Sequence, residues 1–158
     1  IGMPSCGKSA KGKDCARLLN KPFIDLDVEA EKQAGMSITE LFQQQGEQAF
    51  RQIESKLCKK FGAKNGMVLS TGGGVVKNPE NIAALRQNAV VIFIDRPLEQ
   101  LAVGGDRPLS TSMEALAEME QQRRPLYEAA AHCTIKNQGD FDNVVQQIKE
   151  AFDEISGT

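Results

Sequence analysis

Residues 2–9 of the chain read Gly2-Met3-Pro4-Ser5-Cys6-Gly7-Lys8-Ser9, which is the pattern G-x-x-x-x-G-K-[ST] of a phosphate-binding P-loop. Gly2 and Gly7 permit backbone conformations that other residues resist, so that successive N–H groups can turn towards an anion. Lys8 is expected to reach the β- and γ-phosphates of a nucleotide, and Ser9 to place its hydroxyl on Mg²⁺. The residues expected to bind the nucleotide here are Gly2, Ser5, Cys6, Gly7, Lys8, Ser9 and Ala10.

The residues after the loop support this interpretation. A helical pattern begins at once, with Ala16, Leu18 and Leu19 among charged residues, so the positive end of a helix would face the phosphates. A chance match on a glycine-containing turn is the alternative, and this helical context argues against it.

Only Ile1 precedes the loop, although a P-loop is expected to follow a buried strand. Either the numbered sequence omits upstream residues, or the sheet lacks most of a central strand. We favour omission, because a sheet without its middle strand would leave unpaired backbone groups buried.

The composition indicates one ordinary globular domain over residues 1–158. The chain is 41% hydrophobic and 25% charged, with a net charge of −2, so it lacks the basic character of a nucleic-acid or membrane-surface protein. No apolar run approaches the ~18 residues of a membrane span, and no signal peptide is visible. The cysteines show no C-x-x-C pairing, which disfavours zinc. We expect a cytoplasmic monomer with reduced cysteines.

Helical and strand-like segments alternate along the chain. Strands are predicted within residues 21–27, 66–71, 89–94 and 133–135; helices are predicted after the P-loop, at 38–45 and 47–61, from 79, and at 98–102, 112–127 and 141–155. This alternation predicts an α/β fold of three layers with a mainly parallel sheet.

Two acids, Asp25 and Asp27, follow the first predicted strand. Side chains two residues apart on a strand share one face, and ligands of open α/β sheets bind at the carboxyl ends of strands. Two close carboxylates repel each other unless a cation or a proton separates them, and Mg²⁺ would serve. The alternative is a helix N-cap followed by a surface acid.

The helix predicted over 47–61 carries an acid beside its apolar face. The apolar stripe consists of Phe50, Ile53, Leu57 and Phe61. Glu54 lies close to this stripe, and Arg51 lies on the same flank. A buried carboxylate requires a cationic partner, which Arg51 or another arginine could supply. An exposed pair of residues three apart remains equally compatible with the spacing.

Three further segments contain candidate ligand-binding residues. The triplet Gly72-Gly73-Gly74 follows a buried strand, where glycines let backbone N–H groups approach a ligand. Arg107 lies in a glycine-containing segment, 103–111, which we expect to be a lid over the transferring phosphate. Arg123 and Arg124 precede Pro125, and a guanidinium there could grip a carboxylate through two hydrogen bonds.

Taken together, these motifs resemble the shikimate kinase family. The chain has the P-loop, then F-I-D-L-D, G-E-x-x-F-R-x-I-E (residues 46–54), T-G-G-G (71–74), R-P-L and R-x-P-L-Y (123–127), in the family's order across nearly its whole length. The resemblance implies a fold like that of nucleoside monophosphate kinases, with a five-stranded parallel sheet and a closing lid. It also implies that the helices over about 37–62 bind the acceptor.

The resemblance implies a role for each matching residue. Asp27 would contact the substrate hydroxyl as the proposed base, and Asp25 would help to hold Mg²⁺ through water. Arg107 would meet the ATP phosphates and, with Lys8, act in catalysis. The residues that would grip shikimate are Arg51, Gly72, Gly73, Gly74 and Arg123.

The implied reaction is Mg²⁺-dependent transfer of the ATP γ-phosphate to the 3-hydroxyl of shikimate, a step of aromatic amino acid biosynthesis. The residues alone argue only for phosphoryl transfer to a small anionic acceptor. A gluconate-type sugar-acid kinase and a non-catalytic nucleotide-binding half of a fused protein are the alternatives.

The chain departs from the family pattern in two places. Ser5 stands where a third P-loop glycine is frequent, which is tolerable if its φ is negative. The segment 101–106 lacks the arginine that often stacks on adenine. Residues 137–139 could form the other wall of an adenine pocket.

Overall fold

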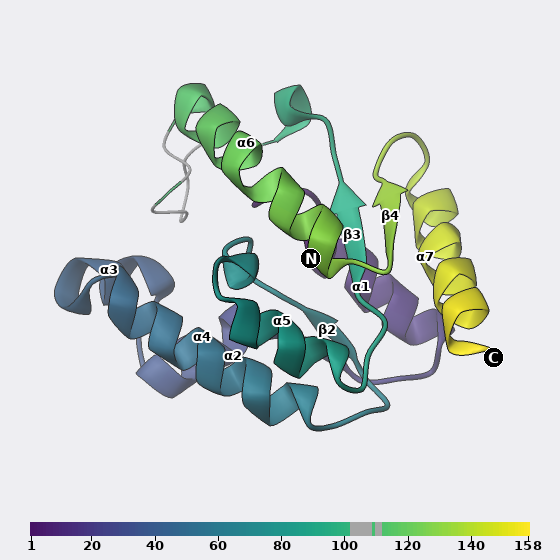
Figure 1. The fold of residues 1–158 in the computed structure, drawn as a ribbon, viewed down its shortest axis with the longest axis horizontal. Coiled ribbons are helices and arrows are strands. Elements are labelled where there is room, and N and C mark those ends of the chain that lie inside the picture. Colours follow the sequence, from purple (N-terminus) through teal and green to yellow (C-terminus); the bar gives the residue numbers. More distant parts are fainter. Residues whose placement is uncertain (102–108, 110–111) are drawn as a thin grey trace.

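A computed structural model describes residues 1–101, 109 and 112–158 of the chain. Helices alternate with short parallel strands along it (Figure 1). In chain order the elements are α1 (Lys8–Leu18), β1 (Phe23–Asp25), α2 (Leu26–Ala34), α3 (Ile38–Gln45), α4 (Glu47–Gly62), β2 (Val68–Ser70), the 3₁₀ turn η1 (Val75–Lys77), α5 (Pro79–Arg86), β3 (Ile92–Asp95), the 3₁₀ turn η2 (Leu98–Gln100), α6 (Met113–Ala130), β4 (Cys133–Lys136) and α7 (Phe141–Ser156).

Side-chain caps explain where several helices begin. Ser37 Oγ accepts a hydrogen bond from the Glu40 N–H, and the Glu40 carboxylate accepts one from the Ser37 N–H, so that the predicted capping box opens α3. Asn78 caps α5 through the Glu80 N–H, with Pro79 at the first helical position. These helix starts were predictable because each cap satisfies N–H groups that the helix cannot satisfy itself.

One helix, α2, was not predicted. Asp25 caps it, because the Asp25 carboxylate accepts hydrogen bonds from the N–H groups of Asp27 (2.9 Å) and Val28 (3.4 Å). The strand therefore ends at Asp25, and Asp27 lies in the first helical turn. The prediction that both acids share one face of a strand is wrong. The alternative of an N-cap is right for Asp25, but Asp27 is half-buried rather than a surface acid.

The strands form two parallel pairs. β1 pairs with β2, with Ile24 opposite Leu69, and β3 pairs with β4, with Phe93 opposite Thr134. The predicted five-stranded sheet is not confirmed, since the part of the chain that the structure describes contains these two pairs and no larger sheet. β1 is short because Asp25, its last residue, already caps α2.

Ile1 lies beside β3. Its nitrogen donates to the Ile92 carbonyl (2.9 Å), and its carbonyl accepts from the Ile94 N–H (2.8 Å), which is the pattern of a parallel ladder. A cavity of about 550 Å³ is lined by Ile1 and by residues of both β2 and β3. Residues of both strand pairs thus border one cavity, and Ile1 borders it as well.

Helices cover both faces of β3. Figure 1 shows α6 in front of this strand and α1 behind it, with α7 packed against α1. Tyr127 of α6 stacks on Phe93 of β3, with ring centroids 5.0 Å apart, and both side chains are buried. The helix, sheet and helix layers therefore enclose one apolar core. None of the helices in the described ranges has the length and apolar character needed to cross a membrane.

Candidate active site

Most of the predicted site residues line one cavity of about 430 Å³ at the carboxyl ends of β1 and β2. These residues are Ser5, Gly7, Lys8, Ser9, Ala10, Asp27, Arg51, Gly72, Gly73, Gly74 and Arg123. Apolar side chains of α3, α4 and α6 complete the wall. Gly2, Cys6 and Asp25 do not line it. The structure thus joins the P-loop to the predicted acceptor residues in a single space.

The P-loop wraps around its own lysine. Gly7 has a φ of 92° and precedes α1, whose first N–H groups have no side-chain cap. Lys8 Nζ donates to the carbonyls of Gly2 (2.9 Å) and Met3 (2.8 Å). Uncapped N–H groups at a helix start bind anions, so the loop presents donors and a cation together.

Ser5 does not meet the condition set from the sequence. Its φ is +63°, in the left-handed region where a side chain costs roughly 1 kcal/mol. Its hydroxyl is buried and has no hydrogen-bond partner among the described residues. The loop therefore holds a strained residue where glycine would be relaxed.

Asn137, the residue that follows β4, forms a hydrogen bond with the P-loop, 131 residues away in the chain. Its side-chain Nδ2 donates to the Cys6 carbonyl at 2.7 Å, and its backbone N–H donates to the Asp95 carbonyl at 2.7 Å. A Cβ on Gly7 would lie 2.7 Å from this Nδ2. Position 7 therefore requires glycine for two reasons, this close approach and its positive φ.

Oxygen atoms gather beside the start of α1. Ser9 Oγ donates to Asp25 Oδ2 (2.7 Å) and lies 3.3 Å from Ser70 Oγ. Hard oxygen donors of this kind, with one carboxylate, suit Mg²⁺. The residues present therefore fit the predicted ion.

The carboxylates of Asp27 and Glu54 lie close to Gly72. A Cβ on this glycine would lie 2.7 Å from Asp27 Oδ1 and 3.2 Å from Glu54 Oε2. Burial raises the pKa of the Asp27 carboxyl, and the neighbouring Asp25 raises it further, against the opposing effect of Lys8 and Arg51. Burial also raises the pKa of Glu54, which Arg51 opposes. Asp27 is thus a more basic carboxylate than a surface acid.

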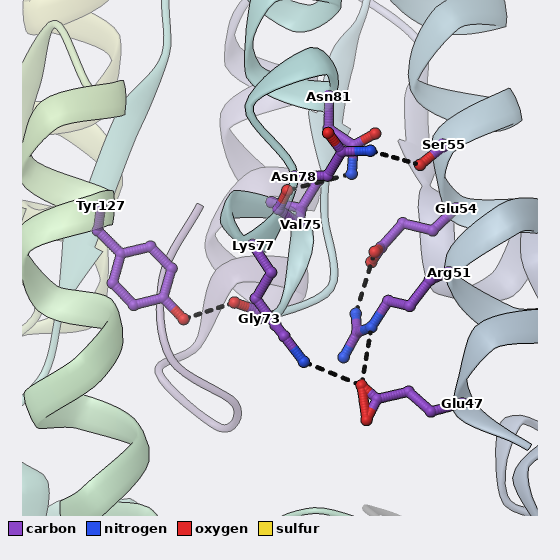
Figure 2. Close-up of polar contacts among 10 residues, drawn as sticks. All are labelled: Glu47, Arg51, Glu54, Ser55, Gly73, Val75, Lys77, Asn78, Asn81 and Tyr127. Carbon is purple, nitrogen blue, oxygen red and sulfur yellow. Dashed lines mark hydrogen bonds and ion pairs between the residues drawn. The ribbon is translucent and has the colours of Figure 1, made fainter.

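Arg51 is the partner of Glu54. Arg51 Nη1 donates to Glu54 Oε1 at 3.0 Å, and Arg51 Nε donates to Glu47 Oε2 at 3.3 Å (Figure 2). Glu54 is only 3% exposed. Of the two alternatives that the spacing left open, the structure shows the buried acid paired with Arg51 rather than an exposed pair.

The two neighbouring arginines of α6 have different environments. Arg123 is 6% exposed and lines the cavity. Arg124 donates through Nη2 and Nη1 to the two Asp95 oxygens (2.7 and 3.1 Å), and through Nε to Glu120. The geometry therefore favours Arg123 as the predicted carboxylate ligand. Arg107 and the predicted lid over 103–111 lie outside the described residues, except for Leu109, which lines the cavity.

Comparison with known proteins identifies the family. Residues 4–153 match the family model described as shikimate kinase. The chain belongs to the shikimate kinase family. It is 41% identical over 154 residues to the shikimate kinase of Clostridium botulinum, covering 95% of this chain and 93% of that protein.

Solved shikimate kinases share its fold. The Acinetobacter baumannii enzyme, in complex with shikimate, superposes with a TM-score of 0.91 at 31% identity, covering 99% of this chain and 92% of the other. The Aquifex aeolicus enzyme gives 0.86 at 32% identity, covering 99% and 95%. The α/β P-loop fold predicted from the sequence is therefore confirmed for this shikimate kinase family member.

Two contacts that support the candidate site were not predicted from the sequence. Glu47 and Lys77 form an ion pair next to Arg51, with Lys77 Nζ 2.9 Å from Glu47 Oε2. The Tyr127 hydroxyl donates to the Gly73 carbonyl at 2.6 Å. Glu47 and Tyr127 both belong to quoted motifs, and that was the available signal. Their partners lie 30 and 54 residues away, a pairing that local spacing does not show.

Proposed function

We propose that this protein transfers the γ-phosphoryl group of ATP to the 3-hydroxyl of shikimate, giving shikimate 3-phosphate for aromatic amino acid biosynthesis. The observation that carries the proposal is the shared cavity, in which the P-loop Lys8 faces the same space as Asp27, Arg51 and Arg123. A phosphate donor and a carboxylate-bearing acceptor would meet there.

The P-loop would hold the nucleotide phosphates. Lys8 would exchange the Gly2 and Met3 carbonyls for phosphate oxygens and keep its charge where negative charge develops during transfer. The N–H groups at the start of α1 would add donors on the same side. Positioning and electrostatic stabilisation are the main contributions a protein makes to phosphoryl transfer.

Ser9 would ligate Mg²⁺ directly, and Asp25 would hold it through water. The hydrogen bond of 2.7 Å between their side chains keeps both oxygens at one point beside the P-loop. The ion, when bound, supplies positive charge to the phosphate oxygens. Asp25 has a second task as the cap of α2, because its other oxygen accepts from backbone N–H groups.

Asp27 would accept the hydrogen bond of the 3-hydroxyl and take its proton as the phosphoryl group moves. A carboxylate whose pKa is raised by burial and by Asp25 is a better proton acceptor than an exposed one. Its place in the first turn of α2, against Gly72, brings this oxygen to the acceptor glycines.

Arg51 and Arg123 would bind the carboxylate of shikimate. Three acids lie near the cavity, namely Asp25, Asp27 and Glu54, and an anionic acceptor would be repelled without compensating cations. The planar guanidinium offers two parallel N–H groups that match a carboxylate. Glycines at 72–74 let the acceptor ring approach the backbone closely.

A purified-enzyme assay with ATP and Mg²⁺ tests this function. Shikimate and gluconate are offered separately, and the parent protein is compared with Lys8→Ala. We expect turnover of shikimate, no turnover of gluconate, and a loss of about 10²-fold or more in kcat for Lys8→Ala. Turnover of gluconate without shikimate, or full activity in Lys8→Ala, would overturn the proposal.

We also propose that the strands belong to one five-stranded parallel sheet, in which Ile1 marks the position between β2 and β3. Two observations support it: the parallel hydrogen bonds from Ile1 to β3, and the cavity of about 550 Å³ lined by both strands. An experimental structure in which β2 turns away from Ile1 would contradict this arrangement.

A further inference from the structure

We propose that Glu47 and Lys77 are positioning residues that aim Arg51 at the acceptor. The inference rests on the proposed function, in which Arg51 binds the acceptor carboxylate. Arg51 lines the cavity of about 430 Å³, whereas Glu47 and Lys77 do not; all three line a second cavity of about 470 Å³. Glu47 and Lys77 act on the other edge of the Arg51 guanidinium, where α4 meets the 3₁₀ turn η1.

A single carboxylate oxygen links the three side chains. Glu47 Oε2 accepts from Arg51 Nε at 3.3 Å and from Lys77 Nζ at 2.9 Å (Figure 2). Glu47 lies one turn before Arg51 at the start of α4, whereas Lys77 ends η1, three residues after Gly74. The link therefore ties the acceptor helix to the segment that carries the acceptor glycines.

The remaining donors of Arg51 are the ones a ligand can use. A guanidinium has five N–H groups; one on Nε goes to Glu47 and one on Nη1 goes to Glu54. Within the described ranges, Nη2 makes no hydrogen bond to protein. A Cβ at Gly74 would overlap the guanidinium, so the bare glycine is what gives these donors room.

Glu54 offers Arg51 a competing geometry. Glu54 Oε2 is buried and has no hydrogen-bond partner among the described residues. An arginine released from Glu47 can rotate and bond both Glu54 oxygens through two parallel N–H groups, the arrangement that arginine and carboxylate prefer. That rotation would withdraw Nη2 from the acceptor. Holding Nε on Glu47 prevents it.

A purely stabilising role does not account for this ion pair. The side chains of Lys77 and Glu47 are 43% and 34% exposed, and ion pairs in such surroundings add little to stability. The hydrogen bond from Lys77 lowers the pKa of Glu47, which keeps the carboxylate charged. The main effect of the ion pair between Glu47 and Lys77 is therefore on the orientation of the Arg51 guanidinium.

Steady-state kinetics of Glu47→Ala and Glu47→Gln test the inference. We expect the KM for shikimate to rise about tenfold in Glu47→Ala and about threefold in Glu47→Gln, which keeps an acceptor for Nε, with kcat and the KM for ATP within about twofold. Asp153→Asn is the matched control, since it removes another carboxylate paired with a cation four residues away, on α7. An unchanged KM for shikimate in Glu47→Ala would overturn the inference.

Exchanging the charges of Glu47 and Lys77 distinguishes two possible roles of this ion pair: orienting Arg51, and merely tethering α4 to η1. The double variant Glu47→Lys with Lys77→Glu restores an ion pair between the two positions but sets a cation against Arg51. We expect its KM for shikimate to remain at least as high as that of Glu47→Ala. Recovery of the parental KM would show that the pair only tethers the two segments, and would overturn the inference.

Arg51→Lys distinguishes failure of the inference from failure of the proposed function. Lysine keeps the charge but loses the fork, so the KM for shikimate should rise by more than about tenfold. If Arg51→Lys shows this rise and Glu47→Ala does not, only the inference is overturned. If Arg51→Lys binds shikimate normally, the proposed acceptor role of Arg51 is wrong, and the inference is overturned with it.

Discussion

Replacing Tyr127 with phenylalanine removes one hydroxyl that joins two walls of the active site. This hydroxyl donates to the Gly73 carbonyl at 2.6 Å, from a side chain that is fully buried. Burial raises the pKa of Tyr127 to about 12, so the group remains a donor at every working pH. Phenylalanine keeps the ring stacked on Phe93 and leaves no large cavity. The change therefore removes the hydrogen bond to Gly73, together with the longer contact of the hydroxyl to Met3 Sδ (3.8 Å), and leaves the ring in place.

The cost follows from what happens to the Gly73 carbonyl. An acceptor left unpaired in a protein costs about 1–3 kcal/mol, and Gly73 is only half-buried, so water can partly replace the hydroxyl. We therefore expect a loss of about 1.5 kcal/mol, which lowers the Tm of a domain of this size by roughly 3–6 °C. Because Gly73 lines the cavity in which we propose that shikimate binds, the KM for shikimate should rise about threefold or more.

Thermal unfolding and steady-state kinetics measure the two effects on the same samples. Asn88→Ala serves as the control, because it also removes a side-chain hydrogen bond to a glycine carbonyl. Its partner is Gly62 (3.0 Å), the last residue of α4, which does not line the cavity of about 430 Å³. The control should lose stability and keep its KM values. A Tyr127→Phe protein with the parental Tm and the parental KM for shikimate would refute the reasoning.

Three further predictions concern the cavity. Asp27→Asn should lower kcat by about 10²–10⁴-fold. The same variant should have a higher Tm at pH 7, because the raised pKa of Asp27 means that its ionised form opposes folding. This gain in Tm should shrink as the pH falls towards about 4, where the carboxyl of the unfolded chain also takes up its proton. A gain in Tm that does not change with pH would contradict this reasoning. Arg123→Ala should raise the KM for shikimate at least about tenfold while sparing the KM for ATP; a selective shikimate defect in Arg124→Ala, with Arg123→Ala normal, would show that the neighbouring residue has the role. Gly74→Ala should displace the Arg51 guanidinium and weaken shikimate binding about tenfold in titrations, whereas parental affinity would show that the guanidinium moves without consequence.

Short sequence patterns predicted those parts of the structure that depend on interactions between residues close together in the chain. The P-loop, the capping box at Ser37 and the Asn78-Pro79 start each satisfy backbone groups within a few residues, so their spacing was sufficient. The buried pair of Glu54 with Arg51 was one of two interpretations that the spacing left equally open, and the structure decides between them. Helix α2 was missed because F-I-D-L-D was interpreted as a continuous strand, although Asp25 followed by acids is also a cap signal.

The rest depends on contacts between distant segments. The hydrogen bond from Tyr127 to Gly73 and the ion pair of Lys77 with Glu47 join different elements, and their residue types alone are those of ordinary surface or core positions. The positive φ of Ser5 was likewise not evident from the sequence. Patterns of three or four residues do not contain that information.

The hydrogen bond from Asn137 to the Cys6 carbonyl spans 131 positions of the chain, and this separation has a consequence for the order of folding. Loops that must close over long distances form slowly, because their entropy is lost before the contact is gained. Residues 2–9 are made well before β4 during synthesis, yet one hydrogen bond that holds the P-loop comes from the residue that follows β4. The P-loop therefore cannot gain this hydrogen bond until β4 has been made, whereas the capping box that opens α3 closes within four consecutive residues.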